Sequence, residues 1–346
     1  MTKTNFRIAC VGAGFFAQLH HAAWLNADGA DLVGIADPSP DAAIPNGVPR
    51  HDSLADLIAD LRATGPVDIL DIITPPATHA ALIEEAIALG VTRIICQKPF
   101  CGTLAEAERV TALAAQAGIS LAVHENFRFQ PWYRALKQVI DECRLGDLYQ
   151  FRFALRPGDG QGAGAYLDRQ PYFQKMERFL VHETAVHFLD LFTFLFGQPD
   201  DIYADLRRLN PAIAGEDAGH IICGYETGFR AVFDGNRLAD HAAENSRLTM
   251  GEAMLEGEKG SLKIDGYGRL LMREHGSVEW QEMVPPATDQ SFGGGCVAAL
   301  CQQAVSAWQA GKEPEVMASS YLEVLRLEEA VYDSAASGRK LAFGRA

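Results

Sequence analysis

Residues 7–17 read RIACVGAGFFA, and this stretch decides the fold of the first third of the chain. Its first five residues form a short apolar run of the kind found in buried strands. The next six, GAGFFA, place glycine at positions 12 and 14 and alanine at 17, and a helical pattern continues to about residue 27. A strand, a glycine-rich turn and a helix in this order are typical of a dinucleotide-binding fold.

The small residues of this turn each have a physical role in such a site. Gly12 permits the tight turn, Gly14 lets a pyrophosphate approach the backbone, and Ala17 allows the helix to pack closely on the strand. The first N–H groups of the helix offer hydrogen-bond donors to the phosphates. We therefore expect Gly12, Gly14, Phe15 and Phe16 to contact the cofactor.

A second strand is predicted at residues 31–36, and Asp37 follows it directly. A carboxylate about 20 residues beyond the glycine motif accepts hydrogen bonds from the ribose hydroxyls of NAD. The same negative charge repels the 2′-phosphate of NADP, so the sequence favours NAD over NADP. The alternative interpretation is a glycine turn and a capping aspartate that bind no cofactor.

Strand-like and helix-like segments keep alternating up to residue 124. Helices are predicted at 54–64, 78–89 and 104–117, and strands at 69–74, 93–97 and 121–124. This alternation predicts an α/β fold in which residues 1–125 form a Rossmann domain with a doubly wound parallel sheet. Ligands of such sheets bind at the carboxyl ends of the strands. We therefore expect one crevice lined by the strand-end residues Thr74, Pro75, His79, Gln97, Lys98 and Asn126.

The pattern changes after residue 125, and residues 126–346 are predicted to form a second α/β domain for substrate binding and oligomerisation. A helix ends near residue 143, and two more are expected at 292–311 and 317–337. Short alternating segments predict a large open sheet, mostly antiparallel, with strands at 147–156, 200–208, 218–226, 228–235, 247–257, 260–264, 269–274 and 278–284. The glycine-rich segment 157–177 between them has the length of a binding loop.

Residues 179–192, FLVHETAVHFLDLF, read as an apolar helix that carries polar side chains. Glu183 and His187 are four residues apart and therefore share a face. His182 and His187 are five apart, which does not match the one-turn spacing of the zinc-protease motif, so the sequence predicts no metal site. The alternative to a catalytic His187 is a buried histidine paired with Glu183 or Asp190 for stability.

Composition narrows the classes of partner. The chain has 346 residues and a formal net charge of −15, which opposes binding to nucleic acid or to an anionic membrane surface. No run approaches the ~18 apolar residues of a membrane span, and the first residues lack the apolar stretch of a signal peptide. Seven cysteines without a CxxC pair are typical of reduced thiols, so we expect a cytoplasmic protein.

Taken together, these motifs resemble the Gfo/Idh/MocA family of NAD(P)-dependent oxidoreductases over nearly the whole chain. The resemblance rests on the glycine motif, the segments 74–79 and 126–131, Lys98-Pro99, the helix from Glu183 to Asp190 and the C-terminal segment 332–338. It implies a Rossmann domain followed by an open-sheet domain that mediates homodimers or homotetramers. It also implies a sugar, a polyol or a similar carbohydrate as the small-molecule substrate.

The chain departs from the usual family pattern at two positions. The family's Glu-Lys-Pro is Gln97-Lys98-Pro99 here, and Glu183 stands where the family usually has aspartate. Both changes keep hydrogen-bonding capacity and alter charge or reach. Segments 96–99, 124–126 and 170–173 together resemble the D-apiose dehydrogenase branch of the family, which implies oxidation of an aldose at its anomeric carbon.

The resemblance implies roles for individual residues. His187 would be the general base, since the ordinary pKa of histidine lies near neutrality, and Glu183 would orient it or bind a substrate hydroxyl. Lys98 would bond the reacting oxygen and stabilise alkoxide charge. Further candidates for hydroxyl binding are Arg128, Tyr172, Arg178 and Asn126. Arg178 could equally make a surface or interdomain contact.

Two other functions fit the same family. One is a non-catalytic regulator that senses a dinucleotide or a sugar, although such a protein has no need to keep both Lys98 and His187. The other is an enzyme that oxidises its substrate transiently before an elimination or epimerisation, with no net change in the nicotinamide. Absorbance assays with a sugar panel separate the first from a dehydrogenase, and product analysis separates the second.

Overall fold

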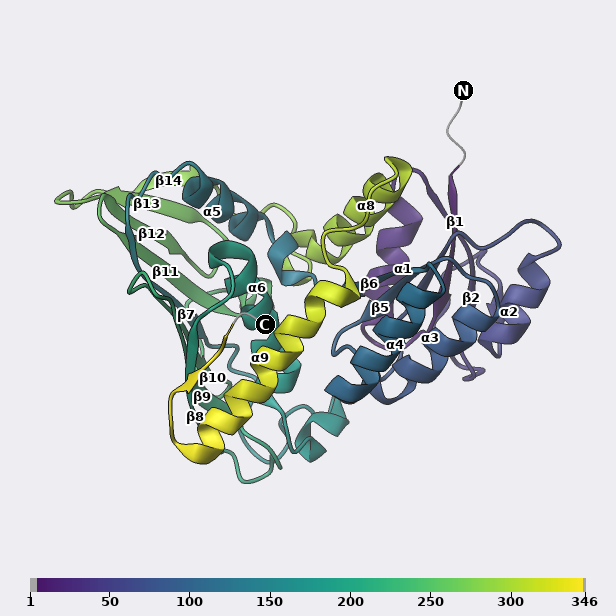
Figure 1. Ribbon diagram of the computed structural model, residues 1–346, viewed down its shortest axis with the longest axis horizontal. Helices are drawn as coiled ribbons and strands as arrows, with labels where there is room; N and C mark the ends of the chain where they lie inside the picture. The colour runs from purple at the N-terminus through teal and green to yellow at the C-terminus, as the bar shows by residue number, and fades with distance from the viewer. Residues whose placement is uncertain (1–4, 345–346) are drawn as a thin grey trace. The chain divides into compact units, whose positions relative to one another are not determined.

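The computed structural model describes residues 5–344, which divide by their backbone contacts into two compact units (Figure 1). The first unit gathers the chain up to Asn126 together with Val297–Glu323. The second gathers Phe127–Cys296 and the chain from Val324 onward. Within residues 5–344, none of the helices combines the length and the apolar character that crossing a bilayer requires.

The segment Val297–Glu323 differs from the sequence prediction, which cut the chain once after residue 125. Its grouping with the first unit has a backbone cause. Val123 N donates to Val316 O at 2.9 Å, and Ala122 forms an isolated antiparallel bridge with Met317. The segment thus extends the edge of the first sheet.

The first unit is built on a six-stranded sheet in the order β3-β2-β1-β4-β5-β6, with all neighbours parallel. Its order reverses between β1 and β4, which is the switch point of a doubly wound fold. The predicted Rossmann arrangement is therefore confirmed. The strands are β1 (Phe6–Val11), β2 (Ala30–Ala36), β3 (Arg50–His51), β4 (Ile69–Ile72), β5 (Arg93–Gln97) and β6 (Ser120–His124).

Helices connect these strands and cover the sheet, and Figure 1 shows α3 and α4 lying side by side across it. Two of them begin at hydroxyl caps, since Ser53 and Thr103 accept hydrogen bonds from the backbone N–H groups of Asp56 and Glu106. The helices are α1 (Ala17–Asn26), α2 (Leu54–Leu61), the 3₁₀ turn η1 (Pro76–Thr78), α3 (His79–Ala88), α4 (Leu104–Gln116) and α8 (Cys296–Gln309), whose first residue belongs to the second unit.

The second unit is built on a nine-stranded sheet in the order β14-β13-β12-β11-β7-β10-β9-β8-β15. Neighbouring strands are antiparallel except β7 and β10, which are parallel. The predicted open, mostly antiparallel sheet is confirmed. Its strands are β7 (Leu148–Leu155), β8 (Asp201–Arg207), β9 (Ala218–Gly224), β10 (Arg230–Asn236), β11 (Gly251–Gly257), β12 (Gly260–Ile264), β13 (Leu270–Glu274), β14 (Gln281–Val284) and β15 (Leu341–Ala342).

One face of this sheet forms the core of the second unit. Phe151 and Phe153 of β7 contact the rings of Phe192 and Phe188, which come from a helix packed on the sheet. The remaining elements are η2 (Phe127–Phe129), α5 (Pro131–Asp141), η3 (Pro171–Lys175), η4 (Leu180–Ala185), α6 (Val186–Phe196), α7 (Ser246–Thr249), η5 (Phe292–Gly295) and α9 (Ala318–Ser337), which begins in the first unit.

The segment predicted as one apolar helix at 179–192 is two helices of different winding. Leu180–Ala185 forms a π-helical turn, and an α-helix continues from Val186. Glu216 shapes the start of the π turn, because its Oε1 accepts hydrogen bonds from the N–H groups of Phe179 and Val181, each at 3.1 Å. Such π turns occur frequently at functional sites.

Candidate active site

The turn after β1 can be made only by glycine at its first position. Gly12 has a φ of +105°, and a Cβ there would lie 2.4 Å from the carbonyl oxygen of Ile73. At Gly14 a Cβ would meet no atom within 4 Å, so its backbone borders open space. That open approach to the start of α1 is what a pyrophosphate requires.

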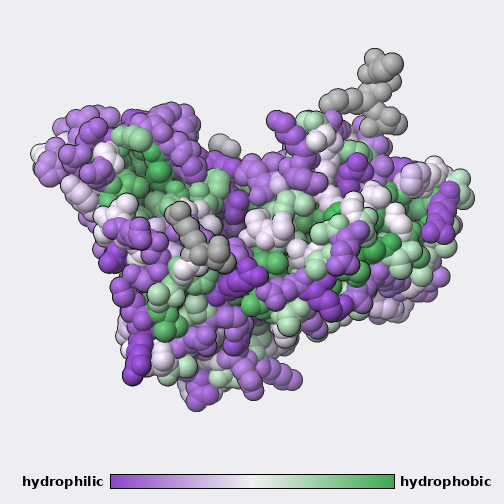
Figure 2. All heavy atoms as spheres, viewed as in Figure 1, coloured by the Kyte–Doolittle hydropathy of each residue, from purple (hydrophilic) through white to green (hydrophobic). Residues whose placement is uncertain are grey.

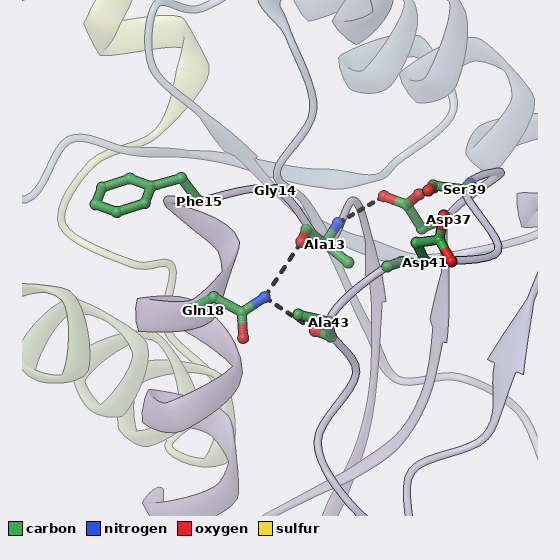
Figure 3. Close-up of a pocket in the computed structure, with 9 residues that line it drawn as sticks. Ala13, Gly14, Phe15, Gln18, Asp37, Ser39, Asp41 and Ala43 are labelled. Carbon is green, nitrogen blue, oxygen red and sulfur yellow. Dashed lines mark hydrogen bonds between the residues drawn. The ribbon is translucent and has the colours of Figure 1, made fainter. Parts of the chain in front are cut away.

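Asp37 closes the same turn through the backbone (Figure 3). Its Oδ2 accepts a hydrogen bond from Ala13 N at 2.8 Å, and its Oδ1 accepts one from Ser39 N at 2.9 Å. Gln18 bridges the turn to the following loop, since its Nε2 donates to Ala13 O at 3.2 Å and to Ala43 O at 2.9 Å. The carboxylate is therefore fixed in the turn that would receive the cofactor.

A pocket of about 380 Å³ lies beside this carboxylate. It is lined by Ala13, Gly14, Phe15, Gln18, Asp37, Ser39, Asp41, Ala42 and Ala43. Two carboxylates in one pocket disfavour an additional phosphate group. The sequence analysis missed the contribution of residues 39–43, although the proline-rich stretch after Asp37 was a signal for a loop at this point.

His79 braces the ends of β4 and β5 from within. Its Nε2 donates to Thr74 O at 2.8 Å, and the ring is fully buried. Burial lowers the pKa of His79 to about 4, against smaller opposing effects of the Thr74 and Pro99 carbonyls. Thr74 also bonds Thr78 through their hydroxyls at 2.6 Å, and Pro75 leads into η1. His79 therefore supports the strand ends as a neutral ring.

The end of β5 holds a half-buried lysine between buried residues. Gln97 Oε1 accepts a hydrogen bond from Lys98 N at 2.6 Å, and the Lys98–Pro99 peptide bond is cis. The amide of Gln97 also reaches His20, at 2.7 Å between the two Nε2 atoms. Gln97 is thus engaged at both ends of its amide inside the protein.

Asn126 and Glu125 follow β6 and are both buried. Glu125 Oε2 accepts a hydrogen bond from the hydroxyl of Tyr321 at 3.1 Å. Asn126 Oδ1 has no hydrogen-bond partner among the residues that the structure describes. A buried acceptor without a partner fits an amide-bearing ligand, because leaving it unpaired is costly. With the open backbone at Gly14 and the fixed Asp37, the first unit fits NAD.

In the second unit, His187 lies on α6 with 4% of its surface exposed. Its ring is parallel to that of Phe127, with 3.8 Å between the centroids. Glu183 lies one turn earlier in the π-helical segment and is half-buried. His182 Nδ1 pairs instead with Glu328 Oε1 at 2.6 Å. Among the described residues, no group of three or more histidine, cysteine or acidic side chains is arranged to hold a metal ion.

Two arginines that the sequence suggested for substrate binding are engaged in ion pairs. Arg128 grips the buried carboxylate of Asp190 with two nitrogens, Nε at 2.8 Å and Nη2. Arg178 donates to both oxygens of Glu329, at 2.6 and 3.0 Å, and its guanidinium lies 4.2 Å from the ring centroid of Tyr332. Each guanidinium is thus oriented by a carboxylate of its own unit.

Tyr172 lies on the segment 157–177 and approaches Glu183. About half of the Tyr172 surface is exposed, and partial desolvation of its hydroxyl, and then the negative charge of Glu183, raise the pKa of Tyr172 to about 12. Its hydroxyl accepts a hydrogen bond from Gln170 Nε2 at 3.1 Å. The structure thus brings Tyr172 and Glu183 into one neighbourhood of the second unit.

The same segment is anchored by a buried arginine that the sequence analysis missed. Arg237 is 2% exposed and donates to Tyr166 Oη at 2.8 Å, to Thr184 Oγ1 at 2.7 Å and to Asp159 Oδ2 at 3.1 Å. Arg169 donates to the same Asp159 oxygen at 3.1 Å. No local pattern announces Arg237, because its partners lie 53 to 78 residues away in the chain.

Comparison with known proteins places this geometry in a family. Residues 6–125 match a model described as an oxidoreductase family with an NAD-binding Rossmann fold, GFO_IDH_MocA. Residues 133–263 match the C-terminal domain model of the same family. The chain belongs to the Gfo/Idh/MocA family of oxidoreductases. The resemblance drawn from the sequence is confirmed.

Individual members of the Gfo/Idh/MocA family match the chain over nearly its full length. A D-apiose dehydrogenase of Paraburkholderia graminis is 33% identical over 98% of this chain and 90% of its own. A second D-apiose dehydrogenase, of Rhizobium rhizogenes, is 30% identical over 99% of both. The crystal structure of an oxidoreductase from Agrobacterium radiobacter in complex with NAD⁺, L-tartaric acid and magnesium superposes with a TM-score of 0.86, at 29% identity and 98% coverage of both chains.

Proposed function

We propose that this protein oxidises a hydroxyl group of a sugar with NAD as the hydride acceptor. D-Apiose or a related aldose, oxidised at the anomeric carbon, is the substrate class we favour, because two near-full-length relatives are D-apiose dehydrogenases. The observation that carries the proposal is the first unit's combination of a ribose-type carboxylate, Asp37, with a half-buried lysine at the carboxyl end of β5. The aldose then becomes a lactone, and NAD⁺ becomes NADH with release of a proton.

In this proposal, three side chains carry the chemistry. Bound NAD supplies C4 of the nicotinamide as the hydride acceptor. Lys98 donates a hydrogen bond to the reacting oxygen and stabilises its developing negative charge. His187 accepts the hydroxyl proton at a ring nitrogen, and the parallel ring of Phe127 fixes its plane. Glu183 orients the substrate or the His187 ring.

The remaining assignments follow from how each side chain is held. Direct cofactor contacts are proposed for Gly12, Gly14, Phe15, Phe16, Asp37, Thr74, Pro75 and Asn126. His79, through Nε2, and Gln97, through both ends of its amide, are bonded inside the protein and are proposed to support the cofactor site from behind. Tyr172 is proposed to bind substrate hydroxyls beside Glu183. Arg128 and Arg178 remain proposed substrate-binding residues, and each guanidinium is held in place by a carboxylate, that of Asp190 or Glu329.

The decisive experiment is an initial-rate screen of aldoses and polyols with NAD and with NADP, followed at the absorbance of the reduced nicotinamide. We expect NAD reduction with a branched or simple aldose and a lactone product by NMR. Ligand binding without any reduction would support the non-catalytic regulator. Conversion of the sugar with no net nicotinamide change would support transient oxidation with elimination or epimerisation.

We also propose that the protein is a homodimer or homotetramer joined through the outer face of the nine-stranded sheet. Paired residues on its inner face, such as Ile221, Phe233 and Phe153, are buried. The neighbouring residues along each strand point to the opposite, outer face. Most of them are apolar, yet residues such as Ile222 and Val232 are only half-buried. Across the sheet, this outer row reads Tyr203, Ile222, Val232, Arg152, Met254, Lys263 and Leu271.

Figure 2 shows further hydrophobic side chains gathered over this sheet near β13 and β14. An apolar surface of this kind marks an interaction site. Light scattering should give two or four times the 37.6 kDa chain mass, and Val232→Asp should lower it. A 37.6 kDa species at micromolar concentration would rule the interface out.

The seven free cysteines, six of them buried, favour a reducing compartment, and we propose the cytoplasm.

A further inference from the structure

Asp71 is a buried carboxylate that hydride transfer does not use. It lies on β4, is fully buried, and its Oδ2 accepts hydrogen bonds from His20 Nδ1 at 2.8 Å and Trp24 Nε1 at 2.7 Å. Both donors come from α1, the helix that begins at the glycine turn. A buried carboxylate is costly unless donors compensate it, so this arrangement ties α1 to the middle of the sheet.

The second nitrogen of His20 continues the chain of hydrogen bonds. The Nδ1 of His20 faces Asp71, and its Nε2 faces the amide nitrogen of Gln97, which can only donate, so we assign Nε2 as the acceptor and Nδ1 as the donor. Gln97 Nε2 lies 2.7 Å from His20 Nε2 and is the donor. At the other end of the same amide, Gln97 Oε1 accepts from Lys98 N at 2.6 Å. These two contacts fix the orientation of the amide, since a flipped group would set acceptor against acceptor and donor against donor.

Every hydrogen bond in this chain therefore runs in one direction. Lys98 N donates to Gln97, Gln97 donates to His20, and His20 donates to Asp71. We infer that Asp71, His20 and Gln97 form a buried positioning relay that fixes the backbone, and thereby the side chain, of Lys98. The inference deepens the proposed function and rests on it, because it assumes that Lys98 meets the reacting oxygen.

The relay explains why position 97 holds a glutamine. A carboxylate there would still accept from Lys98 N, but it would set an acceptor against the acceptor nitrogen of His20. The contact would survive only if the pair took up a proton. The neutral amide of Gln97 makes both contacts without an added proton.

The other side chains packed around His20 are aromatic rings and thiols that are uncharged or apolar. The ring of His124, from β6, lies 4.0 Å away between centroids, and that of Phe16 lies 5.6 Å away. Cys301 Sγ, from α8, lies 3.8 Å from His124 Nε2. Burial lowers the pKa of His124 and raises the pKa values of the Cys10 and Cys301 thiols, so all three are uncharged at neutral pH. Burial opposes the charge of Asp71, yet His20 and Trp24 hold its pKa below the ordinary value.

The test replaces the donor at position 97 and leaves its size unchanged. Gln97→Glu should lower kcat at neutral pH by about 10- to 100-fold, because small displacements of a catalytic group have effects of this size. KM for NAD should stay within about twofold of the wild type. The loss in kcat should shrink as pH falls, since proton uptake restores a donor between the two side chains.

The matched control is Trp24→Phe, which removes the other donor to the same Asp71 oxygen and leaves the relay whole. We expect it to lower the unfolding temperature without changing the pH profile of kcat. If the pH profile of kcat for Gln97→Glu overlays that of the wild type, or lies below it by the same factor at every pH, the relay is refuted.

A second readout does not depend on the substrate. In histidine labelled with ¹⁵N, the wild-type His20 should show the tautomer with the proton on Nδ1, and Gln97→Glu should add a proton to the ring as pH falls. The opposite tautomer in the wild type would overturn the relay. Absence of sugar oxidation by the wild type would count against the proposed function alone, and the ¹⁵N shifts would still decide the relay.

Discussion

The two units hold their polar side chains in different ways. In the first unit, site residues bond mainly to the backbone: Asp37 accepts from Ala13 N, His79 donates to Thr74 O, and Gln97 accepts from Lys98 N. In the second unit, they bond mainly to other side chains. Its main pairs are Arg128–Asp190, Arg178–Glu329, His182–Glu328 and Arg237–Asp159.

This difference has a physical consequence for each half of the proposed reaction. A backbone partner cannot be lost by substitution, so the dinucleotide turn tolerates change around it provided that Gly12 and Asp37 remain. A side-chain pair depends on both members, and a buried charge that loses its partner is strongly destabilising. We therefore expect a substitution that breaks a buried side-chain pair in the second unit to cost more stability than one beside the backbone-bonded turn of the first unit.

The largest expected effect tests one catalytic group in each unit. Lys98→Ala and His187→Ala should each reduce kcat by about 10²–10⁴-fold, the usual cost of losing an acid–base or charge-stabilising group. NAD affinity, measured by calorimetry, should be nearly unchanged in His187→Ala. His182→Gln is the matched control, because that histidine pairs with Glu328. A near-normal kcat in His187→Ala would give His187 a purely structural role.

The second prediction compares how much a buried ion-pair network and an exposed ion pair stabilise the protein. Asp159→Ala removes the carboxylate that Arg237 and Arg169 share and leaves the buried guanidinium of Arg237 without its ion-pair partner. Urea unfolding should show a loss of about 3–5 kcal/mol, as for other broken buried ion pairs. Lys340→Ala breaks an exposed pair with Asp201 and should cost less than about 1 kcal/mol. If both variants lose the same free energy of unfolding, the buried ion pairs stabilise the protein no more than an exposed pair does.

The same contrast explains what could be predicted from the sequence. The strand–turn–helix motif, Asp37 and the strand-end residues around Lys98 follow from local spacing, and the structure has all of them at the turn or the strand ends of one sheet. The π turn at Leu180–Ala185 does not, and the carboxylate that accepts the N–H groups at its start, Glu216, lies more than thirty residues away.

The fates of the predicted arginines show the same limit. Arg128 and Arg178 are attractive as hydroxyl-binding groups in a linear sequence, but Asp190 and Glu329 pair with them from 62 and 151 residues away. No motif or periodic pattern in the sequence indicated a role for Arg237. Side-chain networks that join distant segments leave no periodic or local pattern, so a single sequence reveals their members only after the fold is known.

The third prediction concerns pH and the first unit's neutral histidine. The pKa of His79 is about 4 in the folded state against an ordinary value near 6.5, so the folded protein binds that proton more weakly than the unfolded chain. The contribution of His79 to stability is therefore full above about pH 6.5 and is lost as pH falls toward 4, at up to about 1.4 kcal/mol per pH unit. His79→Gln should flatten this part of the stability curve. Parallel curves for variant and wild type would contradict the assignment.

The smallest expected effect concerns the choice of cofactor. Asp37 has a negative charge whose two oxygens are fixed by Ala13 N and Ser39 N, in a pocket that Asp41 also lines. The charge opposes a 2′-phosphate, whereas the hydrogen bonds shape the turn. Asp37→Ala removes both effects and should shift the NAD-to-NADP ratio of kcat/KM by on the order of tenfold, or about 1.4 kcal/mol.

Asp37→Asn tests the charge with less damage to the turn, because its amide oxygen still accepts one of the two hydrogen bonds from Ala13 N and Ser39 N, whereas Asp37→Ala loses both. If repulsion governs the choice, both variants should relax the preference similarly, and Asp37→Ala should raise KM for NAD more than Asp37→Asn does. Equal kcat/KM for NAD and NADP in the wild type would refute the role of the charge. If only Asp37→Ala changes the NAD-to-NADP ratio of kcat/KM, the turn held by backbone hydrogen bonds selects the cofactor. Backbone bonding would then set the chemistry of the first unit, as side-chain pairs are expected to do in the second.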